Sequence, residues 1–357
     1  MVLQRLEQVR TRMVNAQLDA LLISSSANRR WLTGFSGSAG SVIIGQDCAF
    51  LLVDARYVTQ AKDQAPQFEI IEYVDFYQVA GEMLAGIKAK RAGFETEHVV
   101  HKTWQNLQTK IPLCEWVAVD DWIEQLRGIK NADELALMAK AIAIADEAFE
   151  KLLPYIRPGV SERQVALVLE RLLREGGAER LAFDTIVVSG PRGALPHGAP
   201  TDKLIQQGEL VTLDFGAVWQ GYHSDITRTV AVGSVDPKQK EIYDLVLRAQ
   251  QVGIAAAVSG RTGKQVDAMA REVIAVNGYG DNFGHGLGHG IGLEVHERYP
   301  RLSRAGESVL AEGMICSVEP GIYIPGWGGV RIEDLVCVTA EGPQVLTGAT
   351  KELLILQ

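Results

Sequence analysis

Short apolar runs alternate with helix-like segments along the chain up to about residue 125. Residues 18–24, 41–45, 49–57 and 68–74 form four such runs, which are typical of buried or half-buried strands. The segment before the first run predicts an amphipathic helix, and the alternation as a whole predicts an α/β domain. The apolar face predicted for that first helix consists of Leu3, Leu6, Val9 and Met13.

The apolar pattern weakens between Asp120 and Lys130, and a helix start follows it. Asn131 and Glu134 have the spacing of a capping box, in which each side chain satisfies the other residue's backbone N–H. We therefore divide the chain into domains 1–127 and 128–357. The apolar positions at helical spacing after this cap are Leu135, Met138, Ile142, Ala145, Phe149 and Leu152.

The second domain combines helices with two pairs of strands. A second capping box at Ser161 predicts a helix that stops at the glycines 176–177, and further helices are expected over 240–258 and from Thr262 to about residue 278. The segregation of helices from antiparallel strands predicts an α+β domain. The predicted strand pairs are 210–219 with 223–232, and 314–324 with 329–338.

Each of these strand pairs carries two acidic residues. Asp214 and Asp225 flank a turn at 219–221, and the midpoint of their positions falls within that turn. A hairpin of that register places the two carboxylates directly opposite each other. Opposed like charges destabilise a sheet, and buried carboxylates cost more, so a cation is expected between them. The alternative, a pair of solvent-facing acids, is weakened by the apolar residues on either side.

The second strand pair repeats this arrangement. Glu319 precedes Pro320, which favours extended backbone, and Glu333 lies in an otherwise apolar strand. Arg331 is two residues earlier and therefore on the same face as Glu333. A buried ion pair would explain Arg331 and Glu333 without any function, but it would leave Glu319 unexplained.

Histidines gather in one glycine-rich segment, residues 284–297, which holds His285, His289 and His296. A lone histidine on an apolar face is usually a core residue, whereas three among glycines can reach a shared site. Carboxylates with imidazole and no thiolate favour Mn, Fe, Co or Zn. Four acids suit two ions, and two ions roughly 3.5–4 Å apart can hold a bridging hydroxide and polarise a carbonyl, which is hydrolase chemistry.

The composition narrows the possible partners and location. Hydrophobic residues make up 47% and charged residues 22% of the chain, as in an ordinary soluble globular protein. The net charge of −9 offers no electrostatic footprint for nucleic acid. Four cysteines without C-x-x-C spacing predict reduced thiols, and we find neither a signal peptide nor an apolar stretch of roughly 20 residues. We expect a cytoplasmic protein with no membrane partner.

These motifs resemble the pita-bread metallopeptidases of the methionine aminopeptidase superfamily, in the Xaa-Pro branch that contains aminopeptidase P and prolidase. The resemblance covers nearly the whole chain, and residues 28–40 resemble the creatinase-type N-terminal domain. It implies a pita-bread catalytic domain of the α+β class over 128–357, preceded by an α/β creatinase-like domain over 1–127.

The resemblance also implies a role for each candidate residue. Asp214 resembles a terminal ligand of one metal ion, Asp225 and Glu333 resemble bridging ligands, and His289 and Glu319 resemble terminal ligands of the other ion. Glu319 also matches the acid that moves the proton of the nucleophilic water. The positions that match substrate-contacting or site-lining residues are His197, His296, Tyr323 and Arg331, with Thr227 as a supporting hydroxyl and no role implied for His285.

The implied activity is hydrolysis of the bond between an N-terminal residue and a penultimate proline in small peptides. Two divalent ions are expected, with Mn favoured and Co, Zn or Fe open, and so is a homodimer. We predict an Xaa-Pro aminopeptidase, because residues 189–198 resemble those of small bacterial aminopeptidases; an Xaa-Pro dipeptidase (prolidase) is the alternative. A pita-bread binding protein that has lost its metals is disfavoured because all five ligand positions are present, and a protein like creatinase, which shares the fold without a metal, is disfavoured for the same reason. A nucleotide-binding α/β protein rests only on Gly37–Gly40, which is no P-loop.

Overall fold

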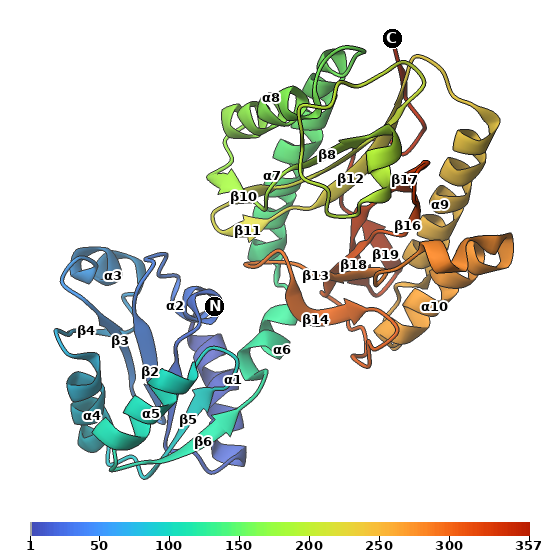
Figure 1. The fold of residues 1–357 in the computed structure, drawn as a ribbon. Coiled ribbons are helices and arrows are strands. Elements are labelled where there is room, and N and C mark those ends of the chain that lie inside the picture. Colours follow the sequence, from blue (N-terminus) through green and yellow to red (C-terminus); the bar gives the residue numbers. More distant parts are fainter. Residues whose placement is uncertain (1) are drawn as a thin grey trace. The chain divides into compact units, whose positions relative to one another are not determined.

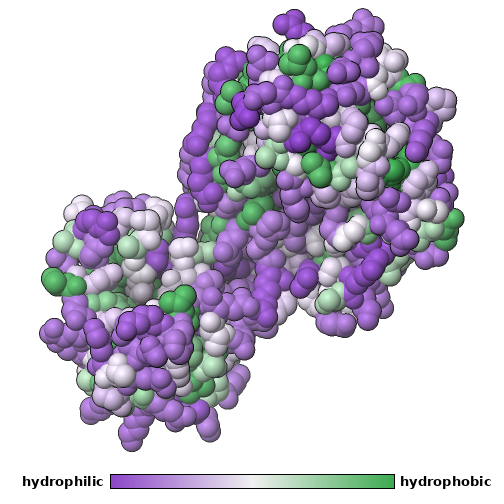
Figure 2. All heavy atoms as spheres, viewed as in Figure 1, coloured by the Kyte–Doolittle hydropathy of each residue, from purple (hydrophilic) through white to green (hydrophobic). Residues whose placement is uncertain are grey.

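The computed structural model describes residues 2–357, which form two compact units, one ending at Arg127 and the other spanning Gly128–Gln357. Figure 2 shows this face of each unit covered mainly by hydrophilic side chains, with hydrophobic ones scattered among them. No helix within residues 2–357 is both long enough and apolar enough to cross a membrane. The cysteines in that range, Cys48, Cys114, Cys316 and Cys337, are free thiols.

The N-terminal unit is an α/β unit built on a mixed six-stranded sheet of order β4-β3-β2-β1-β5-β6. Strand β1 pairs antiparallel with β2 and parallel with β5, and the four apolar runs of the sequence become β1 to β4 (Figure 1). The strands are β1 (Ala20–Ile23), β2 (Ser41–Gly45), β3 (Ala49–Val53), β4 (Glu69–Glu72), β5 (Arg91–Glu95) and β6 (Glu115–Val119). The helices are α1 (Val2–Asn15), α2 (Ser26–Thr33), α3 (Val58–Gln64), α4 (Phe76–Gly86), α5 (His101–Lys110) and α6 (Trp122–Gly128).

Two details of this unit differ from the prediction. Helix α1 buries Leu6, Val9 and Met13, but Leu3 is 69% exposed. The buried stripe passes instead through Arg5, whose guanidinium lies 4.5 Å from the centre of the Trp31 ring, a contact that apolar periodicity does not show. Helix α6 occupies the stretch where the apolar signal weakens, because its seven residues are too few to display a helical period.

The C-terminal unit contains four long helices: α7 (Ala132–Leu152), α8 (Glu162–Glu175), α9 (Pro237–Ala256) and α10 (Gly263–Ile274). All four begin with a complete capping box, formed by Asn131 with Glu134, Ser161 with Gln164, Asp236 with Gln239, and Thr262 with Gln265. Helix α9 starts three residues before the predicted position, because Asp236 caps it and Pro237 suits the first helical turn.

The strands of this unit are short and mostly antiparallel, as predicted. They form sheets of order β20-β12-β9-β8 and β14-β13-β15-β18-β19, with smaller sheets β11-β10-β7 and β16-β17. Their bounds are β7 (Arg180–Leu181), β8 (Ile186–Ser189), β9 (Leu210–Phe215), β10 (Ala217–Trp219), β11 (Tyr222–His223), β12 (Ile226–Val232), β13 (Gly288–Gly290), β14 (Glu297–Leu302), β15 (Ile315–Val318), β16 (Gly321–Ile324), β17 (Gly328–Arg331), β18 (Asp334–Thr339), β19 (Gly342–Val345) and β20 (Ile355–Leu356).

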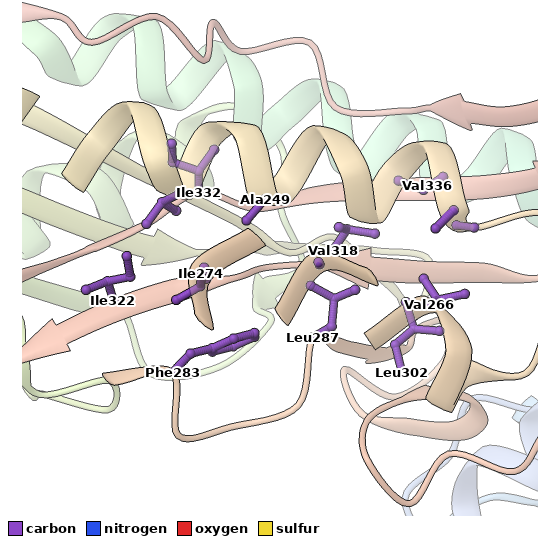
Figure 3. Packing of buried hydrophobic residues seen from close by; sticks show 14 of the residues in the cluster. Ala249, Val266, Ile274, Phe283, Leu287, Leu302, Val318, Ile322, Ile332 and Val336 are labelled. Atoms are coloured by element: carbon purple, nitrogen blue, oxygen red, sulfur yellow. The ribbon is translucent and has the colours of Figure 1, made fainter. Parts of the chain in front are cut away.

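Each helix pair covers one set of strands through its own hydrophobic core. Phe149 of α7 and Leu169 of α8 pack with Phe215 of β9 in one cluster. Ala249 of α9 and Ile274 of α10 belong to the other cluster, which also contains residues of β15, β16 and β18 (Figure 3). Figure 1 shows α9 and α10 beside β16 to β19, and α7 and α8 beside β8 and β12. Each helix-backed layer therefore supports one of the two acid-bearing hairpins.

Candidate metal centre

The register of the first hairpin differs from the prediction. Asp214 pairs with Thr227, and Phe215 pairs with Ile226, so Asp214 does not face Asp225 directly. The turn consists of Gln220 and Gly221, which both have positive φ (45° and 84°), as a tight two-residue hairpin turn requires. This moves the centre of the hairpin one residue toward the C-terminus. Asp225 consequently lies two positions nearer the turn than the partner of Asp214, on the same face of the ribbon.

Asp225 also marks a break in the ladder. It lies between β11 and β12, where the partner strand switches sheets at Gly216. A Cβ at Gly216 would lie 2.0 Å from the carbonyl oxygen of Ser224, so only glycine permits this close approach. Asp225, which lies at this break, is buried inside the unit, with 5% of its surface exposed.

The second hairpin has the same construction. Its register pairs Val318 with Asp334 on one side and Gly321 with Arg331 on the other. Glu319 and Glu333 lie between these two pairs, where β15 gives way to β16 and β17 to β18. Glu333 is 1% exposed, and its backbone N–H donates to the carbonyl oxygen of Thr227 on β12 at 3.1 Å. That bond links the two acid-bearing hairpins directly.

His289 lies on β13 and points its ring at the acids. Its Nε2 is 3.6 Å from Asp225 Oδ2 and 3.4 Å from Glu319 Oε1. Its Nδ1 lies 3.0 Å from the carbonyl oxygen of Gly290 and therefore donates to it, which leaves the lone pair on Nε2 facing the carboxylates. Gly288 on the same strand lets the chain approach closely, because a Cβ there would lie 1.9 Å from the Ser317 carbonyl oxygen.

The side chains of these strands converge into a group suited to a cation. One ligand atom from each of Asp225, His289 and Glu333 lies within 4.8 Å of the other two. Within residues 2–357, the buried atoms Asp214 Oδ1 and Glu333 Oε1 have no hydrogen-bond partner. Buried lone pairs without a donor are costly, and oxygens from carboxylates with one imidazole suit a divalent metal. The donor set therefore fits a metal centre.

The electrostatics of this group lead to the same conclusion. Burial, followed by repulsion from Glu333, Asp214 and Glu319, raises the pKa of Asp225 well above its usual value. Burial and repulsion from Glu319 and Asp214 do the same to the pKa of Glu333. Burial also raises the pKa of Glu319. A divalent cation would offset this repulsion and restore the charged carboxylates.

Arg331 is the positive group that the protein itself supplies, but its partner differs from the one considered from the sequence. Its Nη2 donates to Asp214 Oδ2 at 2.5 Å, so the ion pair is with Asp214 rather than Glu333. Its Nε donates to Thr227 Oγ1 at 3.1 Å, and Thr227 Oγ1 donates to Glu333 Oε2 at 2.7 Å. Thr227, on the first hairpin, thus bonds to both Arg331 and Glu333 of the second hairpin and fixes the orientation of their side chains.

Tyr323 continues this network away from the acids. Its hydroxyl accepts from Arg331 Nη1 at 3.0 Å and lies 2.8 Å from His285 Nε2. His285 Nδ1 lies 2.7 Å from the Gly286 carbonyl oxygen, so the tyrosine hydroxyl is the donor to Nε2. Burial raises the pKa of Tyr323 to about 12, which keeps the phenol protonated. His285, for which the sequence implied no role, therefore orients the Tyr323 side chain.

The two remaining predicted residues are exposed. His296 makes an edge-to-face contact with His289, with ring centres 4.3 Å apart. Burial, followed by the charges of His289 and His197, lowers the pKa of His296. His197 follows Pro196, whose carbonyl oxygen accepts from Arg331 Nη1 at 3.2 Å. Both imidazoles therefore lie near the acid group, with rings accessible from outside.

Two residues of this centre escaped the sequence interpretation. Ser317 Oγ accepts from the backbone N–H of His289 at 3.0 Å and donates to Glu319 Oε1 at 3.1 Å. His223 is buried beside Asp225, and its Nδ1 lies 3.0 Å from the Gly292 carbonyl oxygen. Each lies two residues before a predicted ligand in an extended segment and so shares its face, which is the signal that could have found both.

Comparison with known proteins identifies the family. The model of metallopeptidase family M24 matches residues 136–340, and that of the creatinase/prolidase N-terminal domain matches residues 5–129. The first match covers more than half of the chain, so the chain belongs to metallopeptidase family M24. The fold is accordingly a pita-bread domain preceded by a creatinase-type domain, which confirms the predicted fold class.

Several relatives resemble the chain over nearly its full length. The Xaa-Pro dipeptidase of Pyrococcus horikoshii is 42% identical over 340 residues, covering 94% of this chain and 95% of the relative. The solved structure of an Xaa-Pro dipeptidase from Bacillus anthracis is 43% identical, covers 100% of both chains and superposes with a TM-score of 0.97. The X-Pro aminopeptidase from Thermotoga maritima MSB8 is 38% identical, covers 95% of this chain and 98% of its own, and has a TM-score of 0.90.

Proposed function

We propose that this metallopeptidase hydrolyses the bond between an N-terminal residue and a following proline. The observation that carries the proposal is the convergence of ligand atoms of Asp225, His289 and Glu333 within 4.8 Å of one another. Glu319 lies 3.4 Å from His289, and two buried oxygens, one each from Asp214 and Glu333, have no hydrogen-bond partner. The relatives named as Xaa-Pro dipeptidase and X-Pro aminopeptidase support the choice of substrate. The residues that would hold two divalent ions are Asp214, Asp225, His289, Glu319 and Glu333.

When bound, two divalent ions supply an activated water and polarise the carbonyl of the bond to be cut. Asp225 and Glu333 are the most deeply buried of the five residues, and their carboxylates would help to hold the ions that offset their charge. Arg331 holds one oxygen of Asp214 and leaves the other, Oδ1, without a protein partner. The bond from Arg331 thereby orients the Asp214 carboxylate so that Oδ1 is the oxygen available to a cation.

Glu319 is the residue that would move the proton. Its Oε1 lies 3.4 Å from His289 Nε2, so the carboxylate borders the acid group and could exchange a proton with a water held there. Ser317 donates to its Oε1 and fixes its orientation. We assign Glu319 to accept a proton from the nucleophilic water and to return it to the leaving proline nitrogen.

The exposed histidines would contact the peptide. The lowered pKa of His296 keeps its imidazole neutral at pH 7, with one N–H available to donate to the carbonyl oxygen as negative charge develops on it. We assign His197, which follows the Pro196 carbonyl held by Arg331, to the substrate as well. Tyr323 and Arg331 lie behind these groups and position Asp214 and the segment that carries His197.

The proposal distinguishes two substrate lengths. The relatives named Xaa-Pro dipeptidase support Xaa-Pro dipeptides as the substrate of this enzyme. The relative named X-Pro aminopeptidase, which is 38% identical, supports longer peptides instead. Measuring kcat/KM of the metal-loaded enzyme for Ala-Pro and Ala-Pro-Ala, each against its proline-free counterpart, decides both points. We expect the proline peptides to be preferred at least about 100-fold, the scale on which a shaped site rejects a poor substrate. Equal kcat/KM for Ala-Ala and Ala-Pro would refute the proposal.

We further propose manganese as the metal, a homodimer as the assembly and the cytoplasm as the location. Oxygen-rich ligation with a single imidazole supports manganese among the candidate metals. The free thiols of residues 2–357 support a reducing compartment. Reconstitution of metal-free enzyme with Mn²⁺, Co²⁺, Zn²⁺ or Fe²⁺, with light scattering on the same samples, compares the metals and gives the mass of the assembly.

A further inference from the structure

The segment that carries His296 is a short loop closed at its base. Strands β13 and β14 pair His289 with Arg301 and Gly290 with Glu297, with an irregularity in the register between His289 and Gly290. The six residues 291–296 therefore leave the ladder at Gly290 and return to it at Glu297. His296 is the last residue of this loop, and Glu297 is its immediate neighbour.

Glu297 anchors the loop through its buried side chain. Its Oε1 accepts from the backbone N–H of Leu293, inside the loop, at 3.0 Å. Its Oε2 accepts from Lys130 Nζ at 3.0 Å. In this ion pair the Glu297 side chain is 5% exposed and the Lys130 side chain 1%. A Cβ at Gly292 would lie 2.6 Å from Glu297 Oε1, so the loop backbone packs directly against the carboxylate.

His223 holds the same loop from the side of the acid group. Its backbone N–H donates to the Gly292 carbonyl oxygen at 2.8 Å, and its Nδ1 donates to the same oxygen at 3.0 Å. The ring is fixed in turn by Arg180, whose Nη2 donates to His223 Nε2 at 3.1 Å. The peptide group that joins Gly292 and Leu293 is therefore held at both ends: its carbonyl oxygen accepts from His223, and its N–H donates to Glu297.

We propose that Glu297 is a positioning residue for His296, and that its hydrogen bond to Leu293, rather than its charge, performs this role. Lys130 neutralises the carboxylate so that it can remain buried. The inference rests on the proposed function, because it assigns His296 to the peptide carbonyl. Since the His296 side chain is exposed, the loop anchors, together with the contact of its ring against His289, must hold it in place.

Misplacement of a contacting group by about 1 Å can reduce a rate by about 100-fold, so a loosened loop should be visible in kcat. Two double variants separate the acceptor from the charge. Lys130→Met with Glu297→Gln removes the ion pair but keeps an oxygen for the Leu293 N–H. Lys130→Met with Glu297→Leu removes both, and its apolar side chains replace a buried ion pair at similar volume.

We expect the Met/Gln variant to keep kcat on Ala-Pro within about threefold of wild type and the Met/Leu variant to lose at least about tenfold, both with full metal content. Leu169→Ala, in the core of the other helix layer, is the control for a general loss of stability and should keep kcat. If the two double variants have the same kcat, the proposed role of the Leu293 hydrogen bond is wrong.

A second measurement tests whether Glu297 acts through His296. In a His296→Ala background, exchanging the Met/Gln pair for the Met/Leu pair should change kcat by less than about twofold. If Glu297 acts through His296, the effects of substituting the two residues are not additive, and little remains to be lost once His296 is gone. An undiminished loss in that background overturns the proposal. Crystal structures of the metal-free variants add a readout without catalysis: the His289–His296 ring separation of 4.3 Å should persist in the Met/Gln variant and increase in the Met/Leu variant. If wild-type enzyme cleaves no Xaa-Pro peptide, the proposed function fails, while the ring separation still tests the anchor.

Discussion

Arg331 donates from Nη2 to Asp214 Oδ2 at 2.5 Å across two hairpins that are separated by more than one hundred residues. The guanidinium is 3% exposed and also donates to Tyr323 and Thr227. It is therefore both the counter-charge of an acid-rich group and the mechanical link between its halves. A planar fork with several fixed donors can fill this role, whereas a single ammonium cannot.

Replacing Arg331 should damage the protein in two separable ways. Arg331→Met should lower the free energy of unfolding of the metal-free protein at pH 8 by about 3–5 kcal/mol, the usual cost of breaking a buried ion pair from one side. Arg331→Lys keeps the charge but loses the fork, so it should recover part of the stability and little of the activity. Urea unfolding and kcat measurements on both variants check this. Equal activity of the lysine variant and wild type would show that the fork is unnecessary.

Divalent metal should stabilise the protein increasingly as pH rises. The raised pKa values of Asp225 and Glu333 mean that the folded, metal-free protein holds protons which the unfolded chain releases. Their contribution to stability is thus lost as pH rises from about 4 toward the raised values. Because metal binding needs the charged carboxylates, the increase in Tm on adding Mn²⁺ should grow from pH 5 to pH 8. At one hundred times Kd it should correspond to about 2.7 kcal/mol.

The Asp225→Asn variant is the matched test of this account. It removes one of the mutually repelling charges, so the metal-free variant should melt higher than metal-free wild type at pH 8. It also removes a proposed ligand, so Mn²⁺ should raise its Tm much less. Calorimetry with and without chelator measures both quantities. A metal-free variant that melts lower, with an undiminished increase on adding Mn²⁺, would contradict the proposed role of Asp225.

His289 and His296 should respond differently to alanine although their rings touch. His289→Ala should lose metal, stability and activity together, because its Nε2 faces Asp225 and Glu319. His296→Ala should keep metal and fold but lose kcat by about 10²–10³, the contribution of one donor to a developing oxyanion. Elemental analysis, melting curves and steady-state kinetics compare the two. Loss of metal in His296→Ala would reassign that residue.

His223 should make the protein sensitive to acid. Burial lowers the pKa of His223 to about 4, against an ordinary value of 6.5, so the folded state binds fewer protons than the unfolded chain. The stability contributed by the neutral ring is complete above pH 6.5 and is lost as pH falls toward 4. Between pH 7.5 and pH 5 the loss should be about 2 kcal/mol.

His223→Gln, which can still donate to the Gly292 carbonyl oxygen, isolates this effect. Its free energy of unfolding should fall less over the same pH range than that of wild type, as measured by urea denaturation at each pH. Identical slopes for the two proteins would show that His223 does not titrate as described.

Much of this arrangement could be predicted from local sequence signals. The capping boxes at Asn131, Ser161 and Thr262 act within three residues, so their chemistry is visible in the sequence and is present in the structure. The strand pairs carrying Asp214 and Asp225, and Glu319 and Glu333, could be found from apolar runs interrupted by acids. These are the features for which local pattern and tertiary packing agree.

The register of the first hairpin could not be predicted in the same way. The choice between a turn centred between Trp219 and Gln220 and one centred between Gln220 and Gly221 shifts every pair, and it depends on the positive φ of two adjacent residues. The partner of Arg331 was equally hidden, because Asp214, 117 residues away in the sequence, comes within its reach only after the hairpins meet. The role of His285 depends on Tyr323, which lies 38 residues away in the sequence.

An anomalous difference map from crystals soaked in Mn²⁺ tests the central claim most directly. The account predicts two peaks roughly 3.5–4 Å apart, both within bonding distance of the Asp225 and Glu333 carboxylates. One peak should also contact Asp214, and the other His289 and Glu319. A map with no peak at these carboxylates, from protein that hydrolyses Ala-Pro, would contradict the claim that this acid group is the metal centre of the reaction.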